Sequence, residues 1–440
     1  MPLLDHTNDT RDRWRELQEA NQLRVEVNLD EVERVLELAR RTPGLAPYAS
    51  GLRQLAVFFE TANRELRTQD PGALADFVAF WERYRAVVIQ RFTGITPVEL
   101  RAADTVVANI FDHFIRTVPN EHVAYAEDAT PLAFGGAGGI STYFTHPPGW
   151  NRPFGIINLP HAAFDNVWQW LALPHETGHD FYATVDGLEQ ELETALADRM
   201  RQAVNDGEVA IPNVDFDLNP FGVPHHIQYT GADLLATIWR SWANEAQADI
   251  VGLLTCGGAA IAALQQIIEF SNLDGWHLRR SDGSFEDAPE EHPTSYVRNT
   301  LNIAALRRID GGHADLATEI ETRFHALRPN EPNIVWDLEG IPVVSVPANQ
   351  IEASAVIAAE FLVNHQFNAL GGQSYADLVT FTADDQKLVE KLVDPLLAGD
   401  PSFAQEEGVE PRHALAATVF AFERDRGAAG IINRTFKHFV

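Results

Sequence analysis

Two histidines flank a glutamate in the pentapeptide His-Glu-Thr-Gly-His at residues 175–179. On a helix, residues four positions apart lie on the same face, so His175 and His179 could hold one metal ion between their imidazoles. Glu176, one position along, would reach the side of that ion where a water molecule binds. Two ligands and a general base at this spacing are typical of zinc sites that hydrolyse amide bonds.

A second acidic pair, Glu245 and Asp249, also stands four residues apart on a predicted helix. A catalytic zinc takes three protein ligands and keeps one position open for water, and Glu245 would supply the third ligand. Asp249 would accept the outer N–H of a ligand histidine and fix its tautomer. A solvated acidic face is the alternative. However, apolar residues surround the pair, and carboxylates in such a segment need a partner such as a dication.

The segment before the pentapeptide contains two predicted strands and a proline that affects where the helix begins. Residues 140–144 and 154–159 read as short strands, and a free strand edge beside a metal site can pair with an extended peptide backbone. Pro174 must kink a helix or begin one, which places the histidines early in a helical segment. Gly178 lowers helix stability, so we expect another backbone or the metal-bound water to approach it closely.

A third segment completes an ordered set of motifs. The set is His-Glu-x-x-His from residue 175, Glu-x-x-Ala-Asp from residue 245 and His-Pro-x-x-x-x-Arg from residue 292. In this order the motifs resemble those of the gluzincin metallopeptidases. They are most similar to the group that holds the CAAX prenyl endopeptidases and the HtpX-like proteases. The matched motifs span residues 175–298, somewhat over a quarter of the chain.

The resemblance implies a catalytic zinc centre. It implies one Zn²⁺ per chain, bound by His175, His179 and Glu245. Glu176 would be the general base. Asp249 would be the hydrogen-bond partner of a ligand histidine, with His175 as the first candidate. The implied reaction is hydrolysis of a peptide or protein substrate.

The resemblance also implies residues near the oxyanion of the reaction. These are His292 and Arg298. Apart from the resemblance, Tyr296 and Tyr229 are weaker candidates for the same role, and a structural role is the alternative for each. The chain departs from the family in two respects. Many relatives are embedded in a membrane, whereas no convincing span is visible here, and the long helical flanks have no counterpart in the family pattern.

Two other interpretations remain open from sequence. The chain could be a non-catalytic interaction protein that uses a metallopeptidase-like core as a scaffold for its helical flanks. Alternatively, zinc could be a purely structural ion. Structural sites are usually closed by four ligands and rich in cysteine, and this chain offers three good ligands and one cysteine, which favours the open catalytic site.

The overall composition narrows the function classes. A formal charge of −30 argues against nucleic acid and anionic membrane surfaces as partners. Cys256 is the only cysteine, which excludes an intrachain disulfide and favours a free buried thiol. The apolar run at 250–268 includes Gly257, Gly258, Gln265 and Gln266 and is expected to be a buried helix rather than a membrane span. Because no signal peptide is visible, the expected location is the cytoplasm; the oligomeric state is open.

The expected fold class is α+β and predominantly helical, with a zincin-like metallopeptidase core and a small sheet. The expected division is an N-terminal helical region (1–118), a catalytic core (119–330) and a C-terminal helical region (331–440). Residues 206–231 are expected to form a loop, and the proline-rich stretch 328–347 a connection between regions.

Apolar residues at helical spacing predict helices at 11–20, 29–41, 74–92, 351–367, 382–397 and 411–424. In the last of these, Arg412 and His413 are expected to lie on a solvated face.

Overall fold

A computed structural model describes most of the chain from residue 71 onward and parts of the segment before it. The described residues are 15, 32–42, 45, 48–54, 56–57, 71–93, 97–123, 130–135, 144–146, 154–218, 225–271, 279–281, 292–309, 313–326, 332–338, 341–402 and 407–440.

The protein is predominantly helical, with a few small sheets. Its helices are α3 (Pro71–Thr93), α4 (Pro97–Ile115), α5 (Ala172–Thr184), α6 (Leu188–Asn205), α7 (Gly231–Ser241), α8 (Ala243–Cys256), α9 (Gly258–Ser271), α10 (Ser295–Leu306), α11 (Ala314–Ala326), α12 (Ala348–Asn364), α13 (Tyr375–Leu378), α14 (Ala383–Ala398), α15 (Pro411–Arg424) and α16 (Ala429–Phe439). Short 3-10 helices are η1 (Asn120–His122), η2 (His161–Asp165), η3 (Val167–Leu171), η5 (Asn368–Leu370) and η7 (Arg426–Ala428). The strands are β1 (Leu132–Gly135), β2 (Phe144–His146), β3 (Ile156–Leu159), β4 (Val214–Leu218), β5 (His225–Tyr229), β6 (Arg279–Ser281), β7 (Asn333–Leu338) and β8 (Ile341–Pro347).

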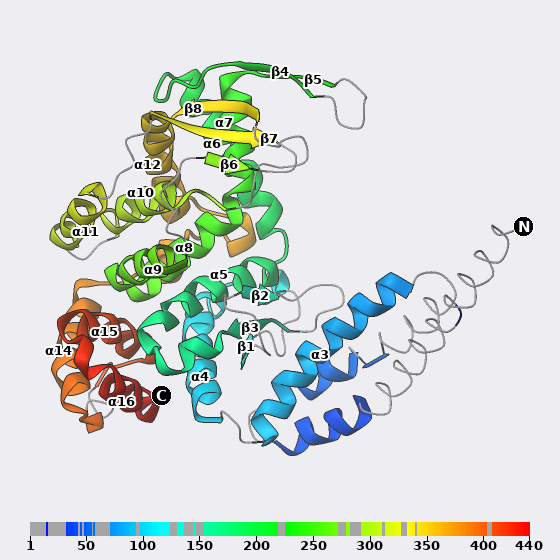
Figure 1. Cartoon of the computed structure of the whole chain (residues 1–440), viewed down its shortest axis with the longest axis vertical. Coiled ribbons are helices and arrows are strands. Elements are labelled where there is room, and N and C mark those ends of the chain that lie inside the picture. Colours follow the sequence, from blue (N-terminus) through cyan, green and yellow to red (C-terminus); the bar gives the residue numbers. More distant parts are fainter. Residues whose placement is uncertain are drawn as a thin grey trace, which may run out of the picture.

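The strands form three separate sheets. The first has the order β1-β3-β2, with β1 parallel and β2 antiparallel to β3. The second is the antiparallel hairpin β4-β5, and the third has the order β6-β7-β8. Helices α5, α8 and α9 occupy the middle of the molecule between the first sheet and the third (Figure 1).

The first sheet separates two hydrophobic cores. Successive side chains of a strand point to opposite faces. Leu132 and Phe134 of β1 therefore pack in a small core with buried residues of the described N-terminal segment, such as Val35 and Leu52, and with α3, whereas Ala133 between them joins the large core. The large core extends from Leu100 in α4 to Phe436 in α16.

Side chains cover the outer edge of β1. Arg91 donates to the carbonyl of Ala133 at 2.7 Å, and the Ala133 N–H donates to Asp104 at 2.9 Å. The amide of Gln90 bonds both the N–H and the carbonyl of Gly135. Because these groups satisfy the backbone of β1, a further strand cannot pair there. Strand β2 forms the opposite edge of the sheet, beside α5.

The helices expected at 74–92, 351–367, 382–397 and 411–424 are confirmed as α3, α12, α14 and α15. Residues 32–41 are helical as expected, whereas the helix expected at 11–20 lies outside the described residues apart from Arg15.

Two expectations about irregular segments are wrong. The expected loop at 206–231 contains the hairpin β4-β5, and its strand signal is the alternation of apolar and acidic residues in Val214–Leu218. The expected connection at 328–347 contains the paired strands β7 and β8. The prolines in this segment favoured a connection, although the apolar residues of β7 and β8 are typical of strands. The division into three regions stays a prediction.

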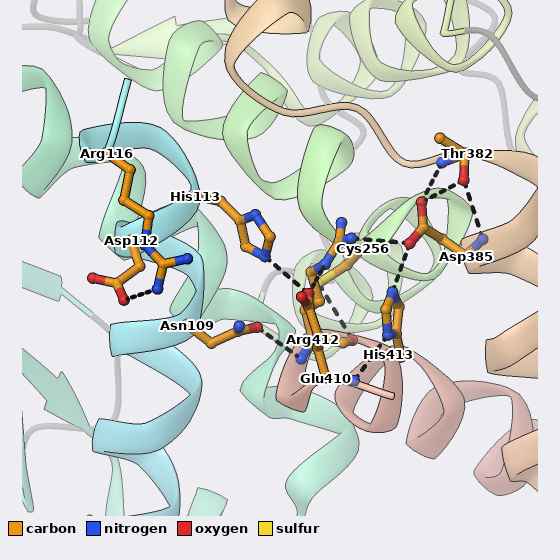
Figure 2. Close-up of polar contacts among 10 residues, drawn as sticks. All are labelled: Asn109, Asp112, His113, Arg116, Cys256, Thr382, Asp385, Glu410, Arg412 and His413. Atoms are coloured by element: carbon orange, nitrogen blue, oxygen red, sulfur yellow. Dashed lines mark hydrogen bonds and ion pairs between the residues drawn. The ribbon is translucent and has the colours of Figure 1, made fainter. Parts of the chain in front are cut away.

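The expected solvated face on α15 is also wrong. Arg412 is 7% exposed and His413 is 1% exposed. Both side chains bond Asp385, Arg412 at 2.9 Å and His413 at 2.7 Å, and Arg412 also donates to Glu410 at 2.7 Å. Glu410 in turn bonds His113 of α4, so that one polar network connects α4, α14 and α15 (Figure 2). The charged residue types suggested exposure, but their partners come from elsewhere in the chain.

The apolar run at 250–268 is helical as expected, but it forms parts of two helices rather than one. These are α8 and α9, which are divided at Gly257, where a φ of +60° ends the first helix. Cys256 is buried and free. Within the described part of the chain, no helix is both long and apolar enough to cross a membrane.

Candidate metal centre

Helix α5 carries the pentapeptide in its first half. The helix begins at Ala172, so Pro174 lies in its first turn, where the missing N–H breaks no helical hydrogen bond. His175 and His179 follow within the next turn and project from one face, with their ring centroids 4.7 Å apart. The local sequence therefore fixes the position of both histidines.

Helix α8 packs directly on α5, and Gly178 makes this contact possible. A Cβ at this position would lie 2.8 Å from Cα of Ala248 and 3.1 Å from Cβ of Val251. Of the two explanations that the sequence allows for this glycine, the structure selects close approach by another backbone. The approach brings the first turns of α8 alongside the histidines.

Three side chains from the two helices converge. Nε2 of His175 lies 3.1 Å from Nε2 of His179. The carboxylate of Glu245 bridges them, with Oε2 at 3.4 Å from His175 and Oε1 at 3.3 Å from His179. These three residues form a group that could hold a metal ion, and one ligand atom from each lies within 4.8 Å of the others.

The outer nitrogens of the two histidines are bonded separately. Nδ1 of His175 lies 2.9 Å from Oδ1 of Asp249, and Nδ1 of His179 lies 2.8 Å from Oδ1 of Asn244. Because an amide or carboxylate oxygen accepts, each Nδ1 carries a hydrogen, and each Nε2 faces the centre as the atom that could bind a metal ion. Sequence reasoning missed Asn244. Its signal was its position one residue before Glu245 on the same helix.

Arg298 of α10 supports the acidic side of the centre. Its guanidinium donates twice to Asp249, at 2.6 and 2.9 Å, and Nη1 lies 3.4 Å from Glu245. The buried amide of Asn302 adds a bond of 3.2 Å to Asp249. Arg298 thus binds the carboxylates behind His175, and its closest contact to that ring is 3.5 Å, to Nδ1.

The carboxylates of Asp249 and Glu245 stabilise positive charge on the groups around them. Burial alone would lower the pKa of His175, but hydrogen bonds with Asp249 and Glu245 outweigh it and raise the pKa to about 10. Burial would raise the pKa of Asp249, but Arg298 and His175 lower it to about 2. The pKa of Glu245 is likewise held well below its usual range against the effect of burial, through its bonds with His175 and His179. Both carboxylates are therefore ionised.

Glu176 lies on the side of α5 that faces β2. It is 6% exposed, and the hydroxyl of Thr145 donates to its Oε2 at 2.7 Å and to its backbone carbonyl at 2.9 Å. Within the described part of the chain, Thr145 is the one donor to this carboxylate, which therefore keeps acceptor capacity for a further proton-bearing group.

The other predicted residues occupy different places. His292 is 55% exposed in its side chain, and its Nε2 lies 3.2 Å from Oε1 of Glu245, so it stands at the solvent side of the centre. Tyr296 is buried and its hydroxyl bonds Glu352 of α12. Tyr229 belongs to the β4-β5 hairpin, which lies at the top of Figure 1, away from α5.

The donor set fits a metal ion. Oε1 of Glu245 lies 3.3 Å from Nε2 of His179 and Oε2 lies 3.4 Å from Nε2 of His175, so each histidine is close to a different oxygen, while the two imidazole nitrogens are 3.1 Å apart. One ligand atom from each residue lies within 4.8 Å of the others, a spacing that one bound ion could span. Oε2 of Glu245 is buried and makes no hydrogen bond among the described residues, having only the 3.4 Å ion-pair contacts. Two imidazole nitrogens and a carboxylate directed at one point attract a cation, which is either a proton on His175 or a metal ion that displaces it.

In comparisons with known proteins, no family model, curated protein or solved structure matches the chain. The interpretation of the centre therefore rests on its own geometry and chemistry.

Proposed function

We propose that this chain is a zinc-dependent metallopeptidase with a zincin-like core. One observation carries the proposal: His175, His179 and Glu245, from two helices far apart in sequence, converge so that one ligand atom of each lies within 4.8 Å of the others, beside Glu176. Two histidines and one glutamate form one of the ligand sets found at catalytic zinc.

Zinc, when bound, would lower the pKa of a water molecule toward neutrality and polarise the scissile carbonyl. Glu176 would take the proton of that water and deliver it to the leaving amine, as general base and then as general acid. Its carboxylate comes from the residue next to His175 and is held by Thr145, which supports this assignment.

His292 and Arg298 would serve the oxyanion side in different ways. His292 lies at the solvent side of Glu245, where its imidazole could donate to the developing negative charge. Arg298 is engaged by Asp249 and Glu245, so its contribution would be to fix these carboxylates and, through Asp249, the ring of His175.

The substrate backbone would bind along β2. The outer edge of β1 is covered by side chains of α3 and α4, whereas β2 forms the other edge of the sheet and packs against α5. An extended peptide paired with an edge strand is held by main-chain hydrogen bonds, which would place its scissile bond beside the centre.

The test compares turnover of a peptide library by the zinc-loaded wild type and by Glu176→Gln. We expect Glu176→Gln to lose at least about a hundredfold in kcat while it retains one zinc per chain. Equal activity in both would remove Glu176 from the mechanism. Glu245→Ala should lose zinc, measured as metal content after dialysis, and retention of one zinc per chain would disprove the ligand assignment.

A further inference from the structure

The hydroxyl of Thr145 connects the edge strand to the glutamate beside the metal centre. Strand β2 pairs with β3 through the register Thr145 to Ile157 and contacts α5. From this strand, Oγ1 of Thr145 reaches Oε2 of Glu176 at 2.7 Å. Nothing in the motif at 175–179 specifies this partner, because it comes from a strand about thirty residues earlier in the chain.

The hydroxyl of Thr145 lies close to two acceptors of Glu176. It is 2.9 Å from the backbone carbonyl and 2.7 Å from Oε2, and its single hydrogen goes to the carboxylate, which is the nearer and stronger acceptor. A carboxylate on a flexible two-carbon stem loses rotamer freedom when its end is tied in this way. Thr145 is the one hydrogen-bond donor to that carboxylate in the described part of the chain.

The donor to Glu176 lies on strand β2 rather than on one of the helices of the centre. Glu176 is 6% exposed, and a buried carboxylate needs a donor. A donor from α5 or α8 would serve that need without involving the sheet. Here it comes instead from the edge strand, which is the strand along which the proposed function places the substrate backbone.

We propose that Thr145 is a positioning residue, whose hydroxyl holds the carboxylate of Glu176 in register with strand β2. This inference rests on the proposed peptidase function. The strand that binds the substrate also orients the general base, so the distance between the scissile bond and the base is set within one rigid unit. A displacement of about 1 Å between reacting groups can cost roughly a hundredfold in rate, which is why such a link would matter.

The kinetic test uses Thr145→Val, which keeps the shape and removes the hydroxyl, and Thr145→Ser, which keeps the hydroxyl. We expect Thr145→Val to lower kcat about tenfold to a hundredfold. KM should change by less than about twofold, because the backbone of β2 still binds the substrate. Thr145→Ser should recover most of kcat. If Thr145→Val turns over like the wild type, or if Thr145→Ser is as impaired as Thr145→Val, the hydroxyl has no positioning role.

A second test needs neither zinc nor turnover. In the metal-free protein, a double-mutant cycle pairs Thr145→Val with Glu176→Ala, and urea unfolding measures stability. We expect Thr145→Val to lower the unfolding midpoint in the wild-type background and to have little effect in the Glu176→Ala background. Equal shifts in both backgrounds would refute the Thr145–Glu176 link.

The two tests separate the two proposals. If the zinc-loaded wild type has no activity that Glu176→Gln abolishes, the peptidase proposal fails, and the role of Thr145 in catalysis fails with it, whatever the cycle shows. If Glu176→Gln abolishes activity and Thr145→Val does not lower kcat, only the positioning role is lost.

Discussion

Oδ1 of Asp249 lies 2.9 Å from Nδ1 of His175, while Nε2 of the same ring faces Glu245. The carboxylate is itself held by two bonds from Arg298. Such an arrangement fixes the tautomer and the orientation of the imidazole before any ion arrives, and it raises the basicity of the ligand nitrogen.

Replacing Asp249 should therefore weaken metal binding. We expect Asp249→Asn to raise the zinc dissociation constant about 10- to 100-fold, because its side chain is a weaker acceptor for His175 and leaves Arg298 poorly neutralised. Competition with a chromogenic chelator measures this constant. Asn244→Ala, which removes the acceptor for His179, should act in the same direction. An unchanged constant in both variants would show that these partners do not organise the ligands.

Gly178 is expected to tolerate no side chain. Gly178→Ala would place Cβ 2.8 Å from Cα of Ala248, and the resulting overpacking should destabilise the protein by about 1–3 kcal/mol. Gly430→Ala in α16 is the matched control, since its Cβ meets only the end of the Arg434 side chain, at 3.6 Å. The control should be neutral or stabilising by up to about 1 kcal/mol, through helix propensity. Urea unfolding of both variants compares the two, and equal effects would mean that the α5–α8 contact is not tight.

The buried network around Asp385 should contribute strongly to stability. Asp385→Asn leaves Arg412 and His413 with a neutral partner in a buried place, and we expect a loss of about 3 kcal/mol. The neighbouring Asp384, with a side chain 86% exposed, pairs only with Lys387 at the surface. Asp384→Asn should change the free energy of unfolding by less than about 0.5 kcal/mol. A loss in Asp385→Asn no larger than in this control would contradict the prediction.

The same network should make stability depend on acid pH. The hydrogen bond from His113, together with Arg412, lowers the pKa of Glu410 from its ordinary value of 4.5 to about 2. A carboxylate with a lowered folded-state pKa stabilises the fold above its unfolded pKa, and that contribution is lost as pH falls through the folded value. The wild type should therefore lose stability between about pH 4.5 and pH 2, and Glu410→Gln should lose less over this window. Urea unfolding at a series of pH values measures the difference between the two slopes. Parallel slopes would exclude Glu410 as a contributor.

Much of the candidate centre could be predicted from the chain itself. The four-residue spacing of His175 and His179 places them on one helical face whatever surrounds them, because helix geometry is local. The same holds for Glu245 and Asp249. Helical periodicity also located α3, α12, α14 and α15, since each buries an apolar face.

Partners that come from distant segments could not be predicted in this way. Asn244 on His179, Thr145 on Glu176 and the burial of Arg412 each depend on which elements the fold packs side by side. The loop and connection expected at 206–231 and 328–347 became strands because a neighbouring strand satisfied their backbone groups.

The sequence by itself determined the chemistry on offer: two imidazoles and a carboxylate at helical spacing, with a second carboxylate one residue after His175. Only the tertiary structure decided that α8 packs close enough on α5, across Gly178, for Glu245 to reach both histidines. The physical reason is that helix periodicity is set by bonds between residues four apart. The meeting of two helices is set by side-chain volumes and backbone approach between segments far apart in the chain.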